Sequence, residues 1–296
     1  MNAPERFTLD RRALTRAFDR AAPGYDAAAW LQQQAAAELL ERLAFFGCAP
    51  RRVLDLGAGT CRASGALAER YPGAQVLAID LAAGMLRAAS GNWWRRRPYE
   101  RICADACALP LPDHSVDLIY SNLMVQWCDR PELLFTELSR VLIPGGLLLF
   151  SSFGPESLAE LREAWTHADA ATHVSEFPDM PALADALLHG GFVEPVLDVE
   201  PLRHHYPDAL ALMRELKRLG AHNAASERQR GLTGRARLRI MQGAYEQRRT
   251  AAGLPATFEL LYAVAFNGTR EPRGNAADHA AGEFVVPLEN LKRRRP

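Results

Sequence analysis

The stretch Val53-Leu54-Asp55-Leu56-Gly57-Ala58-Gly59-Thr60 constrains the fold of this chain more than any other. It reads as a short apolar strand that runs into a glycine turn, and the residues from Ala63 to Arg70 then read as a helix. Gly-x-Gly alone also occurs in ordinary tight turns, but this order of strand, turn and helix brings backbone close to a ligand beside a helix N-terminus. A second apolar strand, from Gln75 to Ile79, ends in Asp80. An acidic residue roughly twenty positions past the glycines suits hydrogen bonds to ribose hydroxyls.

The glycine turn favours a nucleoside over a dinucleotide. The Rossmann dinucleotide fingerprint needs Gly or Ala at the sixth place, where this chain has Arg62. No Gly-Lys-Ser/Thr follows, which excludes a P-loop. Asp55 inside the turn suits a positive amine better than phosphates, and S-adenosylmethionine has an amine, a ribose and no phosphate. The pattern resembles the Asp/Glu-x-Gly-x-Gly-x-Gly of class I S-adenosylmethionine-dependent methyltransferases, with Cys61 in place of the third glycine.

Strand and helix patterns alternate along most of the chain, which predicts a parallel, doubly wound sheet. Further strands are expected at 101–104, 116–120, 147–152, 192–206 and 257–266, and helices at 9–20, 27–45, 81–89, 133–142, 156–168, 181–189, 207–219 and 236–252. We therefore expect an α/β fold: a Rossmann-like, seven-stranded, mostly parallel sheet with a helical cap in the C-terminal half. The expected divisions are a helical lid (1–48), a cofactor-binding core (49–152), a cap with the last two strands (153–267) and a disordered tail (268–296).

Composition narrows the class of protein. Lys and Arg together number 35, equal to Asp and Glu, so the net charge of zero argues against a general nucleic-acid binder. No apolar run nears the ~18 residues of a membrane span, and Met1 to Arg6 has no signal-peptide pattern. The five cysteines are odd in number and lack metal-ligand spacing. We expect reduced thiols, no bound metal and a cytoplasmic protein.

Beyond the sheet motifs, the chain resembles the malonyl-[acyl-carrier protein] O-methyltransferases. The resemblance covers about residues 10 to 266, with Ser175 where Asn is usual as a further departure. It rests on Phe18…Ala21-Ala22…Tyr25-Asp26, Leu31-Gln32, Asp105…Leu109-Pro110, Asp117-Leu118…Ser121-Asn122-Leu123…Gln126-Trp127, Glu137-Leu138…Arg140-Val141-Leu142…Pro144-Gly145-Gly146, Ser157-Leu158…Trp165, His173-Val174…Phe177, Leu212-Met213…Leu216-Lys217…Gly220-Ala221, Gly231-Leu232-Thr233-Gly234-Arg235, Tyr245 and Leu254 to Glu259.

The resemblance implies methyl transfer from S-adenosylmethionine to the free carboxylate of a malonyl thioester, at the opening of the pimeloyl branch of biotin synthesis. A malonyl carboxylate is already ionised at pH 7, so the reaction needs alignment and no general base. The expected cofactor-binding residues are Gln32, Asp55, Gly57, Gly59, Asp80, Leu81, Met85, Asp105, Ala106 and Asn122, with Asp105 accepting from the adenine amino group and Met85 against the ring. The expected positioning residues are Tyr25, Gln126 and Trp127; Tyr25 and Trp127 also read as ordinary packing aromatics. His173 is a further candidate for contact with the substrate.

The expected partner is malonyl-acyl carrier protein, or malonyl-CoA. Carrier proteins are acidic, and residues 207–250 hold ten Lys or Arg against four Asp or Glu. Arg214, Lys217 and Arg218 are spaced to lie on one stripe of a helix and are the expected docking residues. The other reading of this stripe is an ordinary solvated helix face.

Three other functions share parts of this pattern. A methyltransferase for a small acid such as trans-aconitate has the same sheet and cofactor motifs. A complex I assembly factor of this superfamily shares the Ser-Asn-Leu and Gln-Trp stretch, but we find no transit peptide pattern here. A binding module that keeps the fold without catalysis is disfavoured by the intact set of Asp55, Gly57, Gly59, Asp80 and Asp105.

Overall fold

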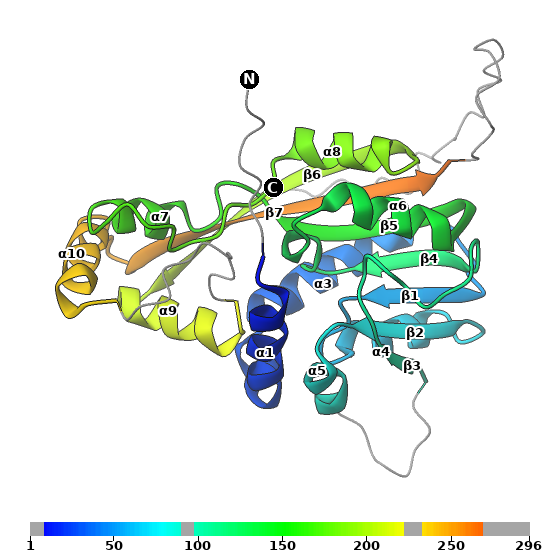
Figure 1. Cartoon of the computed structure of the whole chain (residues 1–296), viewed down its shortest axis with the longest axis horizontal. Helices are drawn as coiled ribbons and strands as arrows, with labels where there is room; N and C mark the ends of the chain where they lie inside the picture. The colour runs from blue at the N-terminus through cyan, green and yellow to red at the C-terminus, as the bar shows by residue number, and fades with distance from the viewer. Residues whose placement is uncertain (1–8, 90–97, 222–232, 269–296) are drawn as a thin grey trace.

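The structure, a computed structural model, describes residues 9–89, 98–221 and 233–268. Within these ranges seven strands form one sheet in the order β3-β2-β1-β4-β5-β7-β6 (Figure 1). The strands are β1 (Arg52–Leu56), β2 (Gln75–Asp80), β3 (Glu100–Cys103), β4 (Val116–Ser121), β5 (Leu142–Phe153), β6 (Phe192–Tyr206) and β7 (Leu254–Asn267). β7 alone runs against its neighbours. The predicted Rossmann-like, seven-stranded, mostly parallel α/β sheet is confirmed.

Helices cover both faces of the sheet and its carboxyl edge (Figure 1). They are α1 (Arg11–Ala21), α2 (Tyr25–Ala28), α3 (Trp30–Arg42), α4 (Arg62–Arg70), α5 (Ala83–Ala88), α6 (Pro131–Val141), α7 (Ala159–Thr166), α8 (Met180–His189), α9 (Ala209–Arg218) and α10 (Arg235–Glu246), with short 3-10 turns η1 (Ala22–Gly24), η2 (Leu43–Phe45) and η3 (Val125–Trp127). Aspartates Asp10, Asp179 and Asp208 cap α1, α8 and α9 by accepting a backbone hydrogen bond from the first turn.

The central strands are buried on both faces, which explains their nearly continuous apolar sequences. Val53, Leu118 and Leu149 belong to the cluster that also contains Leu31 and Leu39 of α3 and Leu67 of α4. The alternate positions Leu54, Ile119 and Leu148 pack with Leu134 and Phe135 of α6 and Leu183 of α8. The sheet is thereby held rigidly between two helical layers, and its carboxyl edge presents the loops that follow the strands.

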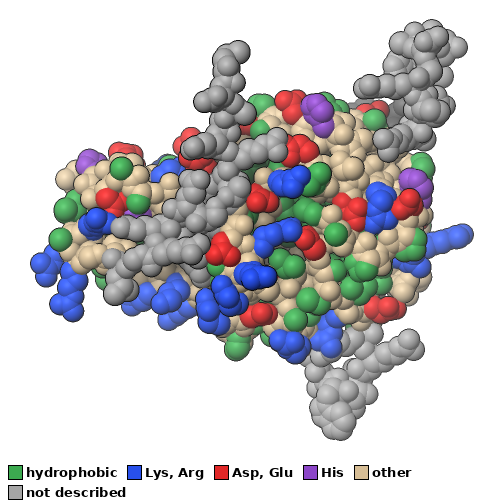
Figure 2. All heavy atoms as spheres, viewed as in Figure 1, with side chains coloured by type: hydrophobic (Ala, Val, Ile, Leu, Met, Phe, Trp, Pro, Cys, Tyr) green, Lys and Arg blue, Asp and Glu red, His purple; other side chains and the backbone are tan. Residues whose placement is uncertain are grey.

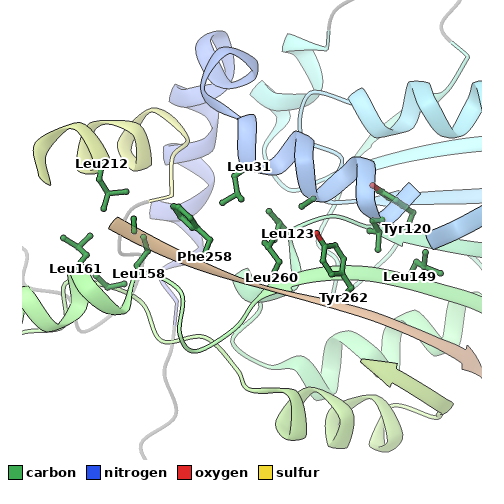
Figure 3. Close-up of a cluster of buried hydrophobic side chains, with 14 of the residues drawn as sticks. Leu31, Tyr120, Leu123, Leu149, Leu158, Leu161, Leu212, Phe258, Leu260 and Tyr262 are labelled. Carbon is green, nitrogen blue, oxygen red and sulfur yellow. The ribbon is translucent and has the colours of Figure 1, made fainter. Parts of the chain in front are cut away.

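The cap consists of α7, α9 and α10, which lie on the long ends of β6 and β7 beyond the sheet's carboxyl edge (Figure 1). Figure 3 shows Leu161, Leu212 and Phe258 of the cap region in one cluster with Leu31, Leu123 and Leu260, which lead on to Tyr120, Leu149 and Tyr262. Cap and sheet therefore share one continuous core. The α8 helix packs on the sheet face beside α6 and takes no part in the cap.

Several predicted boundaries are wrong. The helix expected at 27–45 is interrupted at Ala29 and ends in a 3-10 turn. The helix expected at 156–168 begins only after Leu158, which has a left-handed backbone (φ 58°). The helix expected at 236–252 ends at Glu246, ahead of the bridge between Thr250 and Gly253. β5 begins five residues early because Leu142 already pairs with Val116. The tail expected at 268–296 lies, from residue 269, outside the described residues, as do Gly231 and Leu232.

Candidate active site

A cavity lies at the carboxyl ends of β1, β2 and β4, between the strand ends and the N-terminal helices. We call it the glycine-loop cavity, because Gly57 and Gly59 form part of its wall. Every predicted cofactor-binding residue except Asp55 lines it: Gln32, Gly57, Gly59, Asp80, Leu81, Met85, Asp105, Ala106 and Asn122. The predicted positioning residues Tyr25, Gln126 and Trp127 line it too. The fold thus brings together side chains from five separate stretches of sequence.

Glycine is favoured at positions 57 and 59 for different structural reasons. Both have left-handed backbones, with φ 71° at Gly57 and 53° at Gly59. A Cβ on Gly57 would lie 2.4 Å from Cγ of Met124, so this position is closed by packing. A Cβ on Gly59 would meet only Cε of Met85, at 3.8 Å, and would otherwise enter the cavity. Gly59 is therefore the glycine that keeps space open for a ligand.

Cys61 stands where the methyltransferase pattern has its third glycine, and it also has a left-handed backbone, with φ 60°. Such a conformation strains residues that carry a Cβ, which explains why the methyltransferase pattern has glycine at this position. The side chain is buried against Ala78 and Leu86, and burial raises the pKa of its thiol to about 12. Cys61 is therefore a packing residue in its protonated form.

Asp80 ties the end of β2 to the glycine loop. One carboxylate oxygen accepts from the backbone N–H of Gly59 at 2.8 Å, and the other accepts from that of Ala82 at 2.7 Å. Burial raises the pKa of Asp80, and its two backbone hydrogen bonds oppose the rise. Each carboxylate oxygen can accept a second bond, so the group can hold the loop and receive ligand hydroxyls together.

Asp55 is placed differently from the other predicted acids. Its carboxylate is buried and accepts from Oγ of Ser64 at 2.5 Å, and burial raises its pKa to about 7. It lines a neighbouring cavity, between α3 and the start of α4, whose wall also includes Tyr25, Gln32, Gly57, Gly59 and Asn122. A ligand that extends past the glycine loop into this second space would approach Asp55; a ligand confined to the glycine-loop cavity would not.

The far end of the glycine-loop cavity is formed by Asp105 and Ala106, together with Arg11 of α1. The Arg11 guanidinium donates to both oxygens of Asp105, at 2.6 and 2.8 Å. Asp105 also accepts from the backbone N–H of Cys107 at 2.9 Å. The carboxylate expected to meet the adenine amino group is therefore also bound to the N-terminal helix α1, in a partly exposed pair worth less than about 1 kcal/mol.

Tyr25, Gln32 and Asn122 line both the glycine-loop cavity and the space beside Asp55. Asn122 is fixed, since its side-chain amide donates to the backbone carbonyl of Gln32 at 2.9 Å and accepts from the Ser151 hydroxyl at 2.7 Å. The side-chain oxygen Oε1 of Gln32 is buried and has no hydrogen-bond partner within the described structure. A buried acceptor left unpaired is costly, so this atom suits a donor on a bound ligand. Burial, with Asp80 and Asp26 nearby, raises the pKa of Tyr25 and keeps its phenol protonated.

Gln126 and Trp127 belong to η3, the turn after β4. The Gln126 amide donates to the carbonyl of Leu123 at 2.7 Å, which fixes its orientation. The Trp127 ring packs edge-on against Phe18 of α1, with the ring centroids 5.5 Å apart. Trp127 also lines a second cavity of about 440 Å³ under the cap, which we call the cap cavity. The two cavities have a common wall formed by Gln32, Trp127, Phe153, Leu219 and Ala221.

The predicted substrate and partner residues are divided by the structure. His173 and Lys217 line the cap cavity, whereas Arg214 and Arg218 are exposed on α9 away from both cavities. His173 stacks on Trp165, with centroids 3.7 Å apart, and its Nε2 lies 2.7 Å from Oδ1 of Asp169. The Arg214 side chain donates to the Leu210 carbonyl and pairs with Asp208 at 3.6 Å, so its charge is partly satisfied on its own helix.

Sequence reasoning missed three features of the site. Arg11 reaches Asp105, and Thr60 of the glycine loop donates to Asp26 of the lid at 2.6 Å. Both contacts join segments far apart in the chain, and no local pattern marks them. Arg20, at the end of α1, lines the cap cavity. Its signal was present in the sequence, because Arg12, Arg16 and Arg20 recur at helical spacing.

Across the described ranges, no group of three or more His, Cys, Asp or Glu side chains is placed to hold a metal ion. None of the helices in those same ranges is long and apolar enough to cross a membrane.

Comparison with known proteins gives the family. A methyltransferase domain matches residues 54–150. The chain is 43% identical over 269 residues to the malonyl-[acyl-carrier protein] O-methyltransferase of Gallionella capsiferriformans, covering 88% of this chain and 92% of that one. It is 42% identical to the protein of the same name from Halorhodospira halophila, covering all of both. The fold resembles that of the YcgJ protein of Bacillus subtilis, with a TM-score of 0.55 at 18% identity, over 79% of this chain and 99% of the other. The chain belongs to the malonyl-[acyl-carrier protein] O-methyltransferase family.

Proposed function

We propose that this protein transfers the methyl group of S-adenosylmethionine to the free carboxylate of a malonyl group carried as a thioester on acyl carrier protein. The observation that carries the proposal is the pair of adjoining cavities, in a chain of this family. One cavity has the residues of a nucleoside site, and the other leads away from it under the cap. The product would be a malonyl methyl ester, the expected starting unit of the pimeloyl branch of biotin synthesis.

The glycine-loop cavity fits S-adenosylmethionine on three grounds. The space above Gly59 is open, so backbone can meet the ligand closely. Asp80 retains free lone pairs for ribose hydroxyls, and Asp105 for an adenine amino group. The unpartnered oxygen of Gln32 and the buried Asp55 lie where a ligand amine would find acceptors. Leu81, Met85 and Ala106 supply apolar contact.

Little proton chemistry is required of the protein. S-adenosylmethionine supplies an electrophilic methyl carbon, and a malonyl carboxylate is ionised at neutral pH. The side chains must therefore bind, orient and exclude water; alignment of this kind can supply about 7–11 kcal/mol. Trp127, packed on Phe18, lines the wall between the two cavities, and Gln126, bound to Leu123, lines the glycine-loop cavity. The protonated Tyr25 phenol offers a neutral donor beside them.

The cap cavity favours a substrate on a long arm over a free small acid. Most of its wall is apolar, with Leu158, Leu161, Met213, Leu216 and Phe258 among the lining residues. A trans-aconitate-type enzyme needs a compact polar pocket for a diffusible acid and has no use for such a passage. The exposed cations Arg214 and Arg218 on α9 are proposed to meet the acidic carrier protein.

We place the reaction in the cytoplasm. All five cysteines are unpaired in the structure, as expected for thiols in a reducing compartment.

The test is methyl transfer from labelled S-adenosylmethionine to malonyl-acyl carrier protein, malonyl-CoA and trans-aconitate in parallel. We expect label in a base-labile methyl ester on the malonyl thioesters. Label on trans-aconitate alone, or on an arginine of a protein acceptor, would overturn the proposal. Equal rates of transfer to malonyl-CoA and to malonyl-acyl carrier protein would contradict the part of the proposal that names the carrier protein.

A further inference from the structure

The cap cavity has a wall in common with the glycine-loop cavity and an opening to solvent. Gln32, Trp127 and Phe153, with Leu219 and Ala221 after α9, form the common wall. Among its other lining residues are Arg20 and Lys217, which are both exposed to solvent. A residue that lines a cavity and is also exposed lies at its opening. The cavity therefore leads from a pair of cations at the surface to the place where methyl transfer is proposed.

The two cations come from different helices, and a close backbone contact holds those helices together. Arg20 ends α1, and Lys217 lies in the last turn of α9. Gly220, just after α9, has φ 71° and rests on α1: a Cβ there would lie 3.1 Å from the carbonyl oxygen of Ala17 and 3.2 Å from the Phe18 ring. The approach needs glycine, and it fixes the end of α9 beside the end of α1.

The acidic and basic groups inside the cap cavity are already engaged. The carboxylate of Glu215 accepts from Nε1 of Trp30 and from the hydroxyl of Tyr206, both at 2.7 Å, and is directed toward β6. His173 is bound to Asp169. The acid nearest to Arg20 in sequence, Asp19, accepts from the backbone N–H of Gly84 in α5 at 2.6 Å. Among the residues that the structure describes, positive charge therefore dominates at the opening.

The surface around the opening of the cap cavity also carries positive charge. Figure 2 shows Lys and Arg side chains gathered along the edge where α9 and α10 lie and continuing toward α1. Arg12 and Arg16 are exposed on α1, one and two turns before Arg20. Within this broad basic surface, Arg20 and Lys217 are distinguished because they alone among these cations line the cap cavity.

We propose that Arg20 and Lys217 form a phosphate subsite at the opening of the cap cavity, which binds the phosphate of the pantetheine arm that carries the malonyl thioester. This inference rests on the proposed function. The arm of a carrier protein and that of coenzyme A both attach through phosphate, and both continue as a thin chain that suits apolar walls. With the phosphate held at the opening, the rest of the arm lies in the cap cavity, and the malonyl carboxylate can reach the wall at Gln32 and Trp127. The subsite favours acceptors whose arm carries this phosphate.

The experiment compares two acceptors that differ only in the phosphate: malonyl-pantetheine and malonyl-4′-phosphopantetheine. With the wild-type chain we expect kcat/KM to be about tenfold higher for the phosphorylated acceptor, the effect of two exposed charge-assisted contacts. Arg20→Ala/Lys217→Ala should bring the ratio of the two kcat/KM values close to one, mainly through KM. Arg20→Lys should restore part of the ratio. Arg16→Ala removes an exposed cation of the same helix that does not line the cavity, so the ratio should stay at the wild-type value.

Each outcome has one meaning. A wild-type ratio near one, or a wild-type ratio kept by the double variant, overturns the subsite. A loss confined to malonyl-acyl carrier protein, with the ratio of the two small acceptors unchanged, assigns the cations to contact with the protein surface and also overturns it. Absence of transfer to every malonyl thioester is a failure of the proposed function, and it is recognised because the wild-type chain itself then shows no product.

Discussion

Asp55 gives the sharpest test of how the buried acids of the site behave. Burial raises its pKa from the ordinary value of 3.8 to about 7, opposed by the Ser64 hydrogen bond and reinforced by Asp80. Between these two values the folded protein holds a proton that the unfolded chain has released. The free energy of unfolding therefore falls as the pH rises through this window, and the penalty is complete above the folded pKa.

The size of the effect follows from the pKa difference of about three units, each worth about 1.4 kcal/mol, which gives about 4 kcal/mol in full. Between about pH 5 and pH 8 the expected part is about 2.5 kcal/mol. Asp55→Asn removes the titration. The wild-type chain should thus lose about 2.5 kcal/mol relative to the variant over that range.

The assay is urea unfolding of both chains without S-adenosylmethionine, at several pH values across this range. Subtraction of the two curves removes the other titrating groups. Ser64→Ala is the matched control, since loss of its hydrogen bond should raise the Asp55 pKa further and extend the falling part of the curve to higher pH. Parallel wild-type and Asp55→Asn curves would show that Asp55 is ionised in the folded protein throughout, and would refute the reasoning.

Three further predictions concern the glycine loop. Gly57→Ala should lower Tm markedly, because its Cβ meets Met124, whereas Gly59→Ala should fold with a loss of about 1 kcal/mol and bind S-adenosylhomocysteine weakly; equal Tm values for the two, or full affinity in Gly59→Ala, would contradict the assignment of Gly59 to the ligand. Asp80→Ala should weaken S-adenosylhomocysteine binding by about 1–3 kcal/mol in calorimetric titration, and unchanged affinity would remove the ribose role. Cys61→Gly should keep turnover, because relief of the left-handed strain offsets the lost packing; inactive but folded protein would give the Cys61 side chain a role of its own.

The predicted site residues that the fold brings to one cavity are those set by local pattern. Gly57, Gly59 and Asp80 follow directly from apolar strands, and in parallel sheets the carboxyl ends of neighbouring strands lie at one edge. The same rule was applied to Asn122 after the fourth strand, whereas Asp105 was assigned from the methyltransferase pattern; both line the glycine-loop cavity. Strand ends converge whatever the loops between them do, so this inference needs no tertiary information beyond the order of the sheet.

The features of the site that could not be predicted from the sequence depend on how distant segments pack together. Asp55 follows the same strand-end rule as Asp80, yet its side chain faces α4 and Ser64, away from the main cavity. The direction of alternation along β1 decides this: Leu54 and Leu56 pack with α6, so Asp55 between them must face the opposite layer. The pairing of Arg11 with Asp105 needed the position of α1, which no periodicity supplies.

The N-terminal helix α1 lines both cavities. Arg11, Leu14 and Phe18 line the glycine-loop cavity, and Arg20, on the last turn of the same helix, lines the cap cavity. The helix is attached through polar contacts at Asp105 and Gly84 and through the close approach of Gly220 to Ala17. Gly84 also approaches the backbone of α1, since a Cβ there would lie 3.1 Å from Cα of Asp19. The C-terminal half of α1 is therefore held between α5 and the end of α9, while its N-terminal Arg11 reaches Asp105, where the donor of the methyl group is proposed to enter.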